Sequence, residues 1–583
     1  MREDDFKTIV NEAKETFAAP SISAAVLTDG QVYRYAIGQR GLMGGAVDSD
    51  TVYQIASASK AFIATCVMML VDEGRLELDA PVKSYLPEFQ LWTKELTEQV
   101  TVRDILTHRT GLPRHDVTSF TRPDAVLAET IAYLRWLEPC WGLRERFGYQ
   151  NHMFALASYL VERITGQAWS AVVRERIFTP LGLRRAHTAW LAYERYDDNY
   201  ARPLITRGTT AAPIDSVPTD PMACAGSLSM SAMDLLRWGR ANLEAHGIGQ
   251  RESADGTDGA DGADGTNGTD CARGQLTVSG EAVRELHCAQ MPIRPGELAP
   301  YTEPLVNSLD YGLGWFVERY RGVPLVYHGG TLQGFKSVVG FMPEHGMALA
   351  VLVNQNDSPV PALVLRQVAD AVLGVQPYDW RGFYLDLDTE RQATRQREYK
   401  AAFAEEARVW PPEAGGVYEH PAYGQMRLTQ TPDGPRLAAG WRDYPLRPGA
   451  QAPWVIDASD VSQTLPCQFV YEPARAAADP AGDGPNAPAT DATASPHANV
   501  APADGPAADA VAPAGDGPDA PATDAAASPH ANTSPATAAP PSAEPGVPLA
   551  FCAWLEPELK HPIRFERVAG AHGAGEGRPG ATG

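Results

Sequence analysis

A dense apolar stretch from Ile55 to Gly74 constrains the fold more than any other part of this 583-residue chain. After Lys60 no proline interrupts the stretch and Gly74 supplies a stop, so it predicts a buried helix of about five turns. Ser57 is expected to start the helix, and Lys60, three residues on, lies on the same face. This places an amine base beside a hydroxyl nucleophile, where free backbone N–H groups favour negative charge. The alternative is a capping serine beside a solvated lysine.

The composition argues against several classes of partner. A net charge of -23 would repel nucleic acid. No run of residues is long and apolar enough to span a bilayer, so we expect no membrane partner. The N-terminus is acidic where a signal peptide would be basic, which leads us to expect a cytoplasmic protein. The seven cysteines are scattered without a C-x-x-C pair, so neither a disulfide framework nor a metal site is predicted, and no cofactor is expected.

Residues 1–375 are predicted to form one domain in which strands bracket a helical middle. Ser21–Leu27 and Gln31–Ile37 are β-rich and are separated by a Thr-Asp-Gly turn. From residue 311 onward the pattern changes to strands again, ending at Asn354. The two ends of the domain should therefore build one antiparallel sheet.

The remaining residues are predicted to form a connector and a second, β-rich domain. Residues 376–410 are charged and helical in pattern, and residues 411–568 contain short strand-like runs. Repeated Asp-Gly triplets in about 250–273 and an Ala/Pro-rich tract at 474–546 predict disordered insertions, and 569–583 a disordered tail.

Two further short motifs carry candidate site residues. Tyr149 and Asn151 precede a clear helical pattern, and alternate residues of an extended turn can face one way. The alternative is that Asn151 caps the helix while Tyr149 packs in the core. His328 is followed by Gly329, Gly330 and Thr331, and paired glycines at a strand end let a ligand approach the backbone. The alternative there is a hairpin corner with an incidental histidine.

The three motifs occur in one order, and together they resemble the set found in the penicillin-binding-protein and class C β-lactamase family of serine hydrolases. Supporting stretches stand at the expected places, namely Leu106–Pro113, Ile164–Gly166, Pro180–Leu183, Ala225–Leu228 and Tyr311–Trp315. The resemblance implies an α/β (α+β) fold with a five-stranded antiparallel sheet flanked by helices, a helical domain and a cleft between them. The second domain resembles the lipocalin-like small β-barrel that accompanies some of these hydrolases, including archaeal D-amino-acid-directed serine peptidases.

The resemblance also implies roles for the motif residues. Ser57 would be the nucleophile, and either Lys60 or Tyr149 the acylation base, a question the sequence leaves open. The backbone N–H groups of Ser57 and Thr331 would form the oxyanion hole. Asn151 would donate to the substrate amide and help to hold Lys60, while Tyr149 would activate water for hydrolysis of the acyl-enzyme.

His328 stands where many β-lactamases of this family have a lysine, and histidine is only partly charged near neutral pH. His328-x-Gly330 motifs occur in peptidases and esterases of the superfamily. The sequence therefore predicts a serine hydrolase acting on a small amide, ester or peptide, including peptides with D-amino acids. A true β-lactamase and a non-catalytic ligand-binding or scaffold protein are the alternatives.

Overall fold

The structure is a computed structural model. It describes residues 1–189, 198–207, 210–214, 222–246, 275–298, 303–404, 409–440, 442–450, 454–458, 463–470, 550–553, 555, 558–559 and 562–568. The segments 250–273, 474–546 and 569–583, for which the sequence predicts disorder, lie outside the described residues. Within the described part of the chain, no helix has both the length and the apolar character that crossing a membrane requires.

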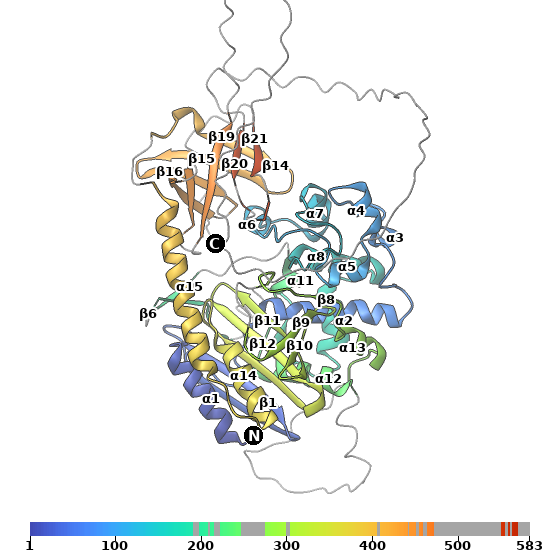
Figure 1. Ribbon diagram of the computed structural model, residues 1–583. Coiled ribbons are helices and arrows are strands. Elements are labelled where there is room, and N and C mark those ends of the chain that lie inside the picture. Colours follow the sequence, from blue (N-terminus) through green and yellow to red (C-terminus); the bar gives the residue numbers. More distant parts are fainter. Residues whose placement is uncertain are drawn as a thin grey trace, which may run out of the picture. The chain divides into compact units, whose positions relative to one another are not determined.

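The part of the chain up to residue 373 is built on a large antiparallel sheet with helices on both faces (Figure 1). Counted over the described residues, its strands are eight, in the order β2-β1-β13-β12-β11-β10-β9-β8. In that order they span Gln31–Gly38, Ser21–Thr28, Met347–Val353, Phe335–Met342, Val323–Leu332, Phe316–Tyr320, Val306–Tyr311 and Met291–Pro292. Pairing of Ile22 with Val353 joins the N-terminal hairpin to the later strands, as the sequence predicts.

The prediction of a five-stranded sheet was wrong, since the sheet continues through β10, β9 and β8. Strand β9 was not recognised because it is a polar strand near the sheet edge. Its residues Asn307 and Ser308 are exposed and only Tyr311 is buried, so apolar alternation is weak. Strand β8 has only two residues, one of them a proline, and carries almost no pattern.

The central strand β13 explains how the sheet supports two layers of helix. Its residues Leu349, Val351 and Val353 pack in one core with α1 (Glu3–Thr16) and α14 (Val360–Leu373). The alternate residues Ala348, Ala350 and Leu352 pack in the other core, with α2 (Ser59–Asp72) and α12 (Ala232–Glu244). Because both faces are covered, the strand is apolar throughout.

The helical middle surrounds the apolar stretch that opens the sequence pattern. Ser57 lies in a 3-10 turn, Ala56–Ala58, which leads directly into α2, Ser59–Asp72. The other helices of this region are α3 (Val82–Tyr85), α4 (Lys94–Gln99), α5 (Val102–Leu106), α6 (Val117–Thr121), α7 (Leu127–Tyr133), α8 (Asn151–Thr165), α9 (Trp169–Val173), α11 (Ala223–Gly226), α12 (Ala232–Glu244) and α13 (Gly280–Leu286). Short strands β3 (Tyr53–Gln54), β7 (Ser229–Met230) and β4 (Ala186–His187) pair beside them, as do β5 (Leu204–Arg207) and β6 (Thr210–Pro213).

Helix α15, Trp380–Ala402, leads from the sheet region to a closed antiparallel barrel. The barrel strands β14–β21 span Gly416–His420, Gly424–Thr431, Gly434–Ala439, Arg442–Pro448, Trp454–Ala458, Gln463–Val470, Ala550–Ala553 and Ile563–Arg567. Pairing of β14 with β21 closes it. The barrel contacts the helical region through Tyr423, whose hydroxyl oxygen lies 2.7 Å from His115 Nδ1.

Candidate active site

The turn that carries Ser57 has an unusual backbone. The preceding residue, Ala56, adopts a left-handed conformation with φ +48°, which costs roughly 1–2 kcal/mol for a residue with a side chain. The carbonyl of Ile55 accepts a hydrogen bond of 2.6 Å from Ser337 Oγ on β12. Strained backbone of this kind persists only where surrounding contacts hold it, and it often marks a functional site.

Gly330 brings strand β11 against this turn. A Cβ atom added at Gly330 would stand 2.0 Å from the Ile55 carbonyl oxygen and 2.4 Å from Ser337 Oγ. Both distances are far inside van der Waals contact, so any side chain at 330 would push β11 away from Ser57. Thr331, the next residue on the strand, pairs with Lys336 of β12.

Lys60 is fully buried, with three polar contacts at its ammonium group. Its Nζ lies 3.1 Å from Ser57 Oγ, 2.7 Å from Asn151 Oδ1 and 2.9 Å from the Ala225 carbonyl oxygen. None of these atoms belongs to a carboxylate. The lysine is therefore not the solvated side chain of the alternative interpretation.

Tyr149 and Asn151 reach the same place from the start of α8. The Tyr149 hydroxyl hydrogen-bonds Ser57, and its ring centroid lies 4.9 Å from Lys60 Nζ. Asn151 does not cap the helix, because the side chain of Gln150 accepts the hydrogen bond from the His152 N–H instead. The carboxamide of Asn151 is thereby left to contact Lys60.

Burial and charge set the protonation of these groups. Burial, together with the nearby Arg114 guanidinium, lowers the pKa of Lys60 to about 7, while Asp116 opposes the shift. Burial raises the pKa of the Tyr149 phenol above its ordinary value. Near neutral pH the site therefore favours an uncharged amine over a phenolate.

His328 lies in the wall of the site with both ring nitrogens engaged. Its Nδ1 lies 2.6 Å from the Gly329 carbonyl oxygen, which can only accept, so Nδ1 carries the proton. Its Nε2 therefore accepts from the Tyr311 hydroxyl at 3.0 Å. Burial and the proximity of Lys60 lower its pKa to about 3, so this ring is neutral across the physiological range.

The structure thus gathers Ser57, Lys60, Tyr149 and Asn151 through direct contacts, with Gly330 packed against the same turn. It also adds residues that the sequence did not single out. Asp116 Oδ1 accepts a hydrogen bond of 2.8 Å from Asn151 Nδ2, and Arg114 pairs with Asp116 at 2.6 Å. Their sequence signal is only their position directly after the Leu106–Pro113 stretch.

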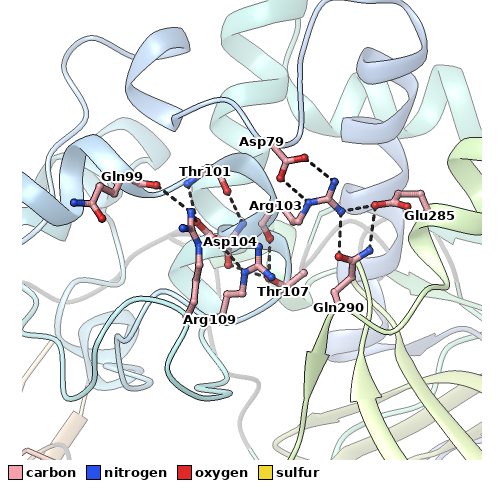
Figure 2. A network of polar contacts seen from close by, with 10 residues as sticks. Asp79, Gln99, Thr101, Arg103, Asp104, Thr107, Arg109, Glu285 and Gln290 are labelled. Carbon is pink, nitrogen blue, oxygen red and sulfur yellow. Dashed lines mark hydrogen bonds and ion pairs between the residues drawn. The ribbon is translucent and has the colours of Figure 1, made fainter. Parts of the chain in front are cut away.

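The buried carboxylate of Asp104 ties together two loops, one carrying Arg109 and the other Arg144 (Figure 2). It accepts hydrogen bonds from the Thr101 N–H, from Arg109 Nε at 2.5 Å and from Arg144 Nη2 at 2.7 Å. Arg109 belongs to the loop that carries His108, whose ring centroid lies 4.3 Å from that of Tyr149. The network fixes the loops rather than contacting the reacting groups.

The described residues contain no cluster of three or more histidine, cysteine or acidic side chains that could hold a metal ion. The polar groups around Ser57 are an amine, a phenol and a carboxamide. This set suits nucleophilic catalysis by an activated hydroxyl.

Comparison with known proteins gives a consistent family match. The family model described as Beta-lactamase matches residues 6–374. The chain is 24% identical to unguisins hydrolase ungD' of Aspergillus campestris over 494 residues, covering 81% of this chain and 82% of that protein. It is 29% identical to penicillin-binding protein 4 of Amycolatopsis lactamdurans over 347 residues, covering 58% of this chain and 81% of the relative.

Among solved structures, the octameric penicillin-binding protein homologue from Pyrococcus abyssi is similar in fold, with a TM-score of 0.53 and 22% identity. The match covers 80% of this chain and 96% of that one. It extends beyond the 369 residues of the family match.

Proposed function

Because this chain belongs to the beta-lactamase family and is a serine hydrolase, we propose that it acts through an acyl-enzyme on Ser57. The observation that carries the proposal is the contact of Nζ of the fully buried Lys60 with Oγ of the half-buried Ser57 at 3.1 Å. A base within hydrogen-bond reach of a hydroxyl is the arrangement that nucleophilic catalysis requires.

In acylation, Ser57 Oγ attacks the substrate carbonyl carbon and Lys60 takes the hydroxyl proton. We assign this step to Lys60 rather than Tyr149, because burial lowers the pKa of the amine to about 7 but raises that of the phenol. A neutral amine is thus available near pH 7, whereas a phenolate would have to form against the cost of burial.

The carbonyl electrons move onto oxygen, and we assign stabilisation of that oxyanion to the N–H groups of Ser57 and Thr331. Gly330 supports the assignment, since its close packing on Ile55 keeps β11 beside the Ser57 turn. One such donor is typically worth about 2.7–4 kcal/mol in the transition state. Collapse of the intermediate breaks the bond to the leaving amine or alcohol, which takes the proton that Lys60 received from Ser57. Water then attacks the ester carbonyl, the bond to Ser57 Oγ breaks, and one proton of that water returns to Ser57.

We propose a small amide, ester or peptide as the substrate, with peptides that contain D-amino acids in the test set. His328 supports this choice, because a buried neutral imidazole offers no cation for the carboxylate of a β-lactam. A relative named a penicillin-binding protein favours a second candidate, in which β-lactams also acylate Ser57.

The test is intact-mass measurement after treatment with a fluorophosphonate probe, followed by activity screening of D- and L-aminoacyl amides, peptides, esters and nitrocefin. We expect one adduct on the wild-type protein, none on Ser57→Ala, and an unchanged adduct on Ser84→Ala, a matched variant at an exposed serine. A folded wild-type protein without an adduct would support the non-catalytic scaffold instead. Nitrocefin turnover no faster than that of Ser57→Ala would remove the β-lactamase candidate.

A further inference from the structure

We propose that Asp116 is a positioning residue that holds the Asn151 carboxamide against Lys60. Arg114 and Asp116 also act in opposite directions on the protonation of Lys60, the base that activates Ser57. This inference rests on the proposed function and extends it to two residues outside the three motifs. It starts from a continuous chain of contacts running from Arg114 through Asp116 and Asn151 to Lys60.

The orientation of the Asn151 amide follows from its two partners. Its Oδ1 accepts from Lys60 Nζ at 2.7 Å and its Nδ2 donates to Asp116 Oδ1 at 2.8 Å. A flipped amide would place its NH₂ against an amine donor and its oxygen against a carboxylate, so both contacts would become repulsive. Asp116 therefore selects one orientation of the Asn151 carboxamide. One Nδ2 hydrogen bonds the Asp116 carboxylate, and the other points away from it.

Arg114 holds Asp116 from the opposite side. Arg114 Nε lies 2.7 Å and Nη2 lies 2.6 Å from Asp116 Oδ2, the oxygen that does not contact Asn151. The Arg114 guanidinium carbon also lies 5.1 Å from the centroid of the Tyr149 ring. The pair thus touches both the amide that contacts Lys60 and the phenol that contacts Ser57.

The residue between them fixes the backbone of this segment. His115 has φ +50°, and its Nε2 lies 2.9 Å from the Glu138 carbonyl oxygen. Since that oxygen can only accept, Nε2 carries the proton and Nδ1 accepts from the Tyr423 hydroxyl at 2.7 Å. With His115 held on both sides, Arg114 and Asp116 have a defined starting point from which to reach the site.

Arg114 and Asp116 are the fully ionised groups that influence Lys60, and their effects on its pKa are opposite. The other titratable groups facing it are Cys224 on α11, His108 on the loop after α5, Tyr149 before α8 and His328 on β11. Burial keeps Cys224 and Tyr149 in their neutral thiol and phenol forms and disfavours the imidazolium forms of both histidines. Asp116 raises and Arg114 lowers the pKa of Tyr149 as well, so the predicted direction is the same for either base.

The experiment measures the rate of acylation of the full chain by an activated-ester probe between pH 5 and 9. Asp116→Ala removes the acceptor for Asn151, and we expect a loss of roughly 10- to 100-fold at the pH optimum, the range for a charge-assisted hydrogen bond. Asp116→Asn keeps a side-chain oxygen that can accept from Asn151, so its loss of rate should be smaller than that of Asp116→Ala.

The pH profile separates a positioning role from a structural one. Removing the negative charge in Asp116→Asn should move the acidic limb to lower pH by about one unit, and Arg114→Gln should move it to higher pH. The double variant should return toward the wild-type limb. Asp370→Asn, a buried carboxylate bonded to Arg321, is the matched control and should lower stability without moving the limb.

Equal limbs in all variants, with wild-type acylation intact, would overturn the inference and leave the proposed function standing. A wild-type protein that is not acylated at all would overturn the proposed function first. If Asp116→Ala fails to fold, the opposite shifts of Asp116→Asn and Arg114→Gln still decide.

Discussion

Two buried cations in this protein, Lys60 and Arg366, are accommodated in opposite ways. Arg366 on α14 is 3% exposed and pairs with the carboxylates of Glu318 and Glu303. Those carboxylates raise the pKa of its guanidinium, which stays charged. Lys60 is equally buried but contacts a hydroxyl, a carboxamide and a carbonyl, and its pKa falls to about 7.

The difference separates a structural charge from a chemical one. A buried ion is tolerated when it is paired, and otherwise it shifts its pKa and becomes neutral. Arg366 follows the first course and ties α14 to β10 of the sheet. Lys60 follows the second course. In its neutral form the amine can accept the proton of the Ser57 hydroxyl.

The largest expected effect comes from removing the amine of Lys60. Lys60→Met keeps the volume but removes the base, so acylation should slow by on the order of 10²- to 10⁴-fold. Its stability should change little, because Met removes the cost of burying the amine but also removes the donor to the Asn151 and Ala225 oxygens. Stopped-flow acylation and thermal melting measure the two quantities. Near-normal acylation would assign the proton transfer to another group, with Tyr149 the first candidate.

The buried ion pair of Arg366 should show the reverse result, a loss of stability with little change in acylation. Glu318→Gln leaves Arg366 with one fewer buried carboxylate, and the free energy of unfolding should fall by about 3–5 kcal/mol. Urea denaturation measures this loss, with Glu344→Gln at an exposed turn as a control of the same chemistry. Acylation per folded molecule should stay within a factor of two or so of wild type at a temperature where both proteins are folded. A selective loss of acylation would show that the Arg366 ion pair also supports the catalytic groups.

The free energy of unfolding should depend on pH through Lys60 but not through Arg366. The pKa of Lys60 is about 7 in the folded chain and 10.5 ordinarily, so between these values the unfolded chain binds a proton that the folded chain does not. The free energy of unfolding should therefore rise with pH in this window, by up to about 1.4 kcal/mol per unit. Arg366 stays charged throughout and contributes no such slope.

The measurement compares wild type with Lys60→Met from pH 7 to 9.5, since titrations elsewhere in the chain are common to both proteins. The difference in unfolding free energy should change with pH in the stated direction. Below pH 7 acylation should fall by about tenfold per unit as Lys60 becomes protonated. A flat difference would mean that Lys60 keeps an ordinary pKa.

The sequence predicted the groups of the site better than their surroundings. The Ser57 and Lys60 spacing, the Tyr149 and Asn151 pair, and the N-terminal hairpin follow local periodicity, which a sequence displays directly. Arg114 and Asp116 could not be found in this way. They lie on an irregular segment whose only relation to Asn151 is through the folded chain.

Dependence on the folded surroundings also explains why strand β9 and the charge of His328 were not predicted correctly. Strand β9, next to the edge strand β8, is half polar and has only weak apolar alternation to detect. His328 was expected to be partly charged near neutral pH, but burial beside Lys60 lowers its pKa to about 3. A sequence pattern gives the residue type, whereas burial is a property of the surrounding fold.

The smallest expected effect concerns His115, a buried titratable group that burial keeps neutral although its hydrogen bond to the Glu138 carbonyl oxygen opposes the shift in its pKa. Burial lowers its pKa to about 3, and Tyr423 of the barrel donates to its Nδ1. Tyr423→Phe removes that donor and should reduce the free energy of unfolding by about 1 kcal/mol. Tyr35→Phe, which removes a hydroxyl bonded to Asn11, is the matched control. If the barrel only supports the fold, acylation by the folded variant stays unchanged. A fall in acylation with an unchanged melting temperature would instead mean that Tyr423 supports the catalytic groups, as we propose for Arg114 and Asp116.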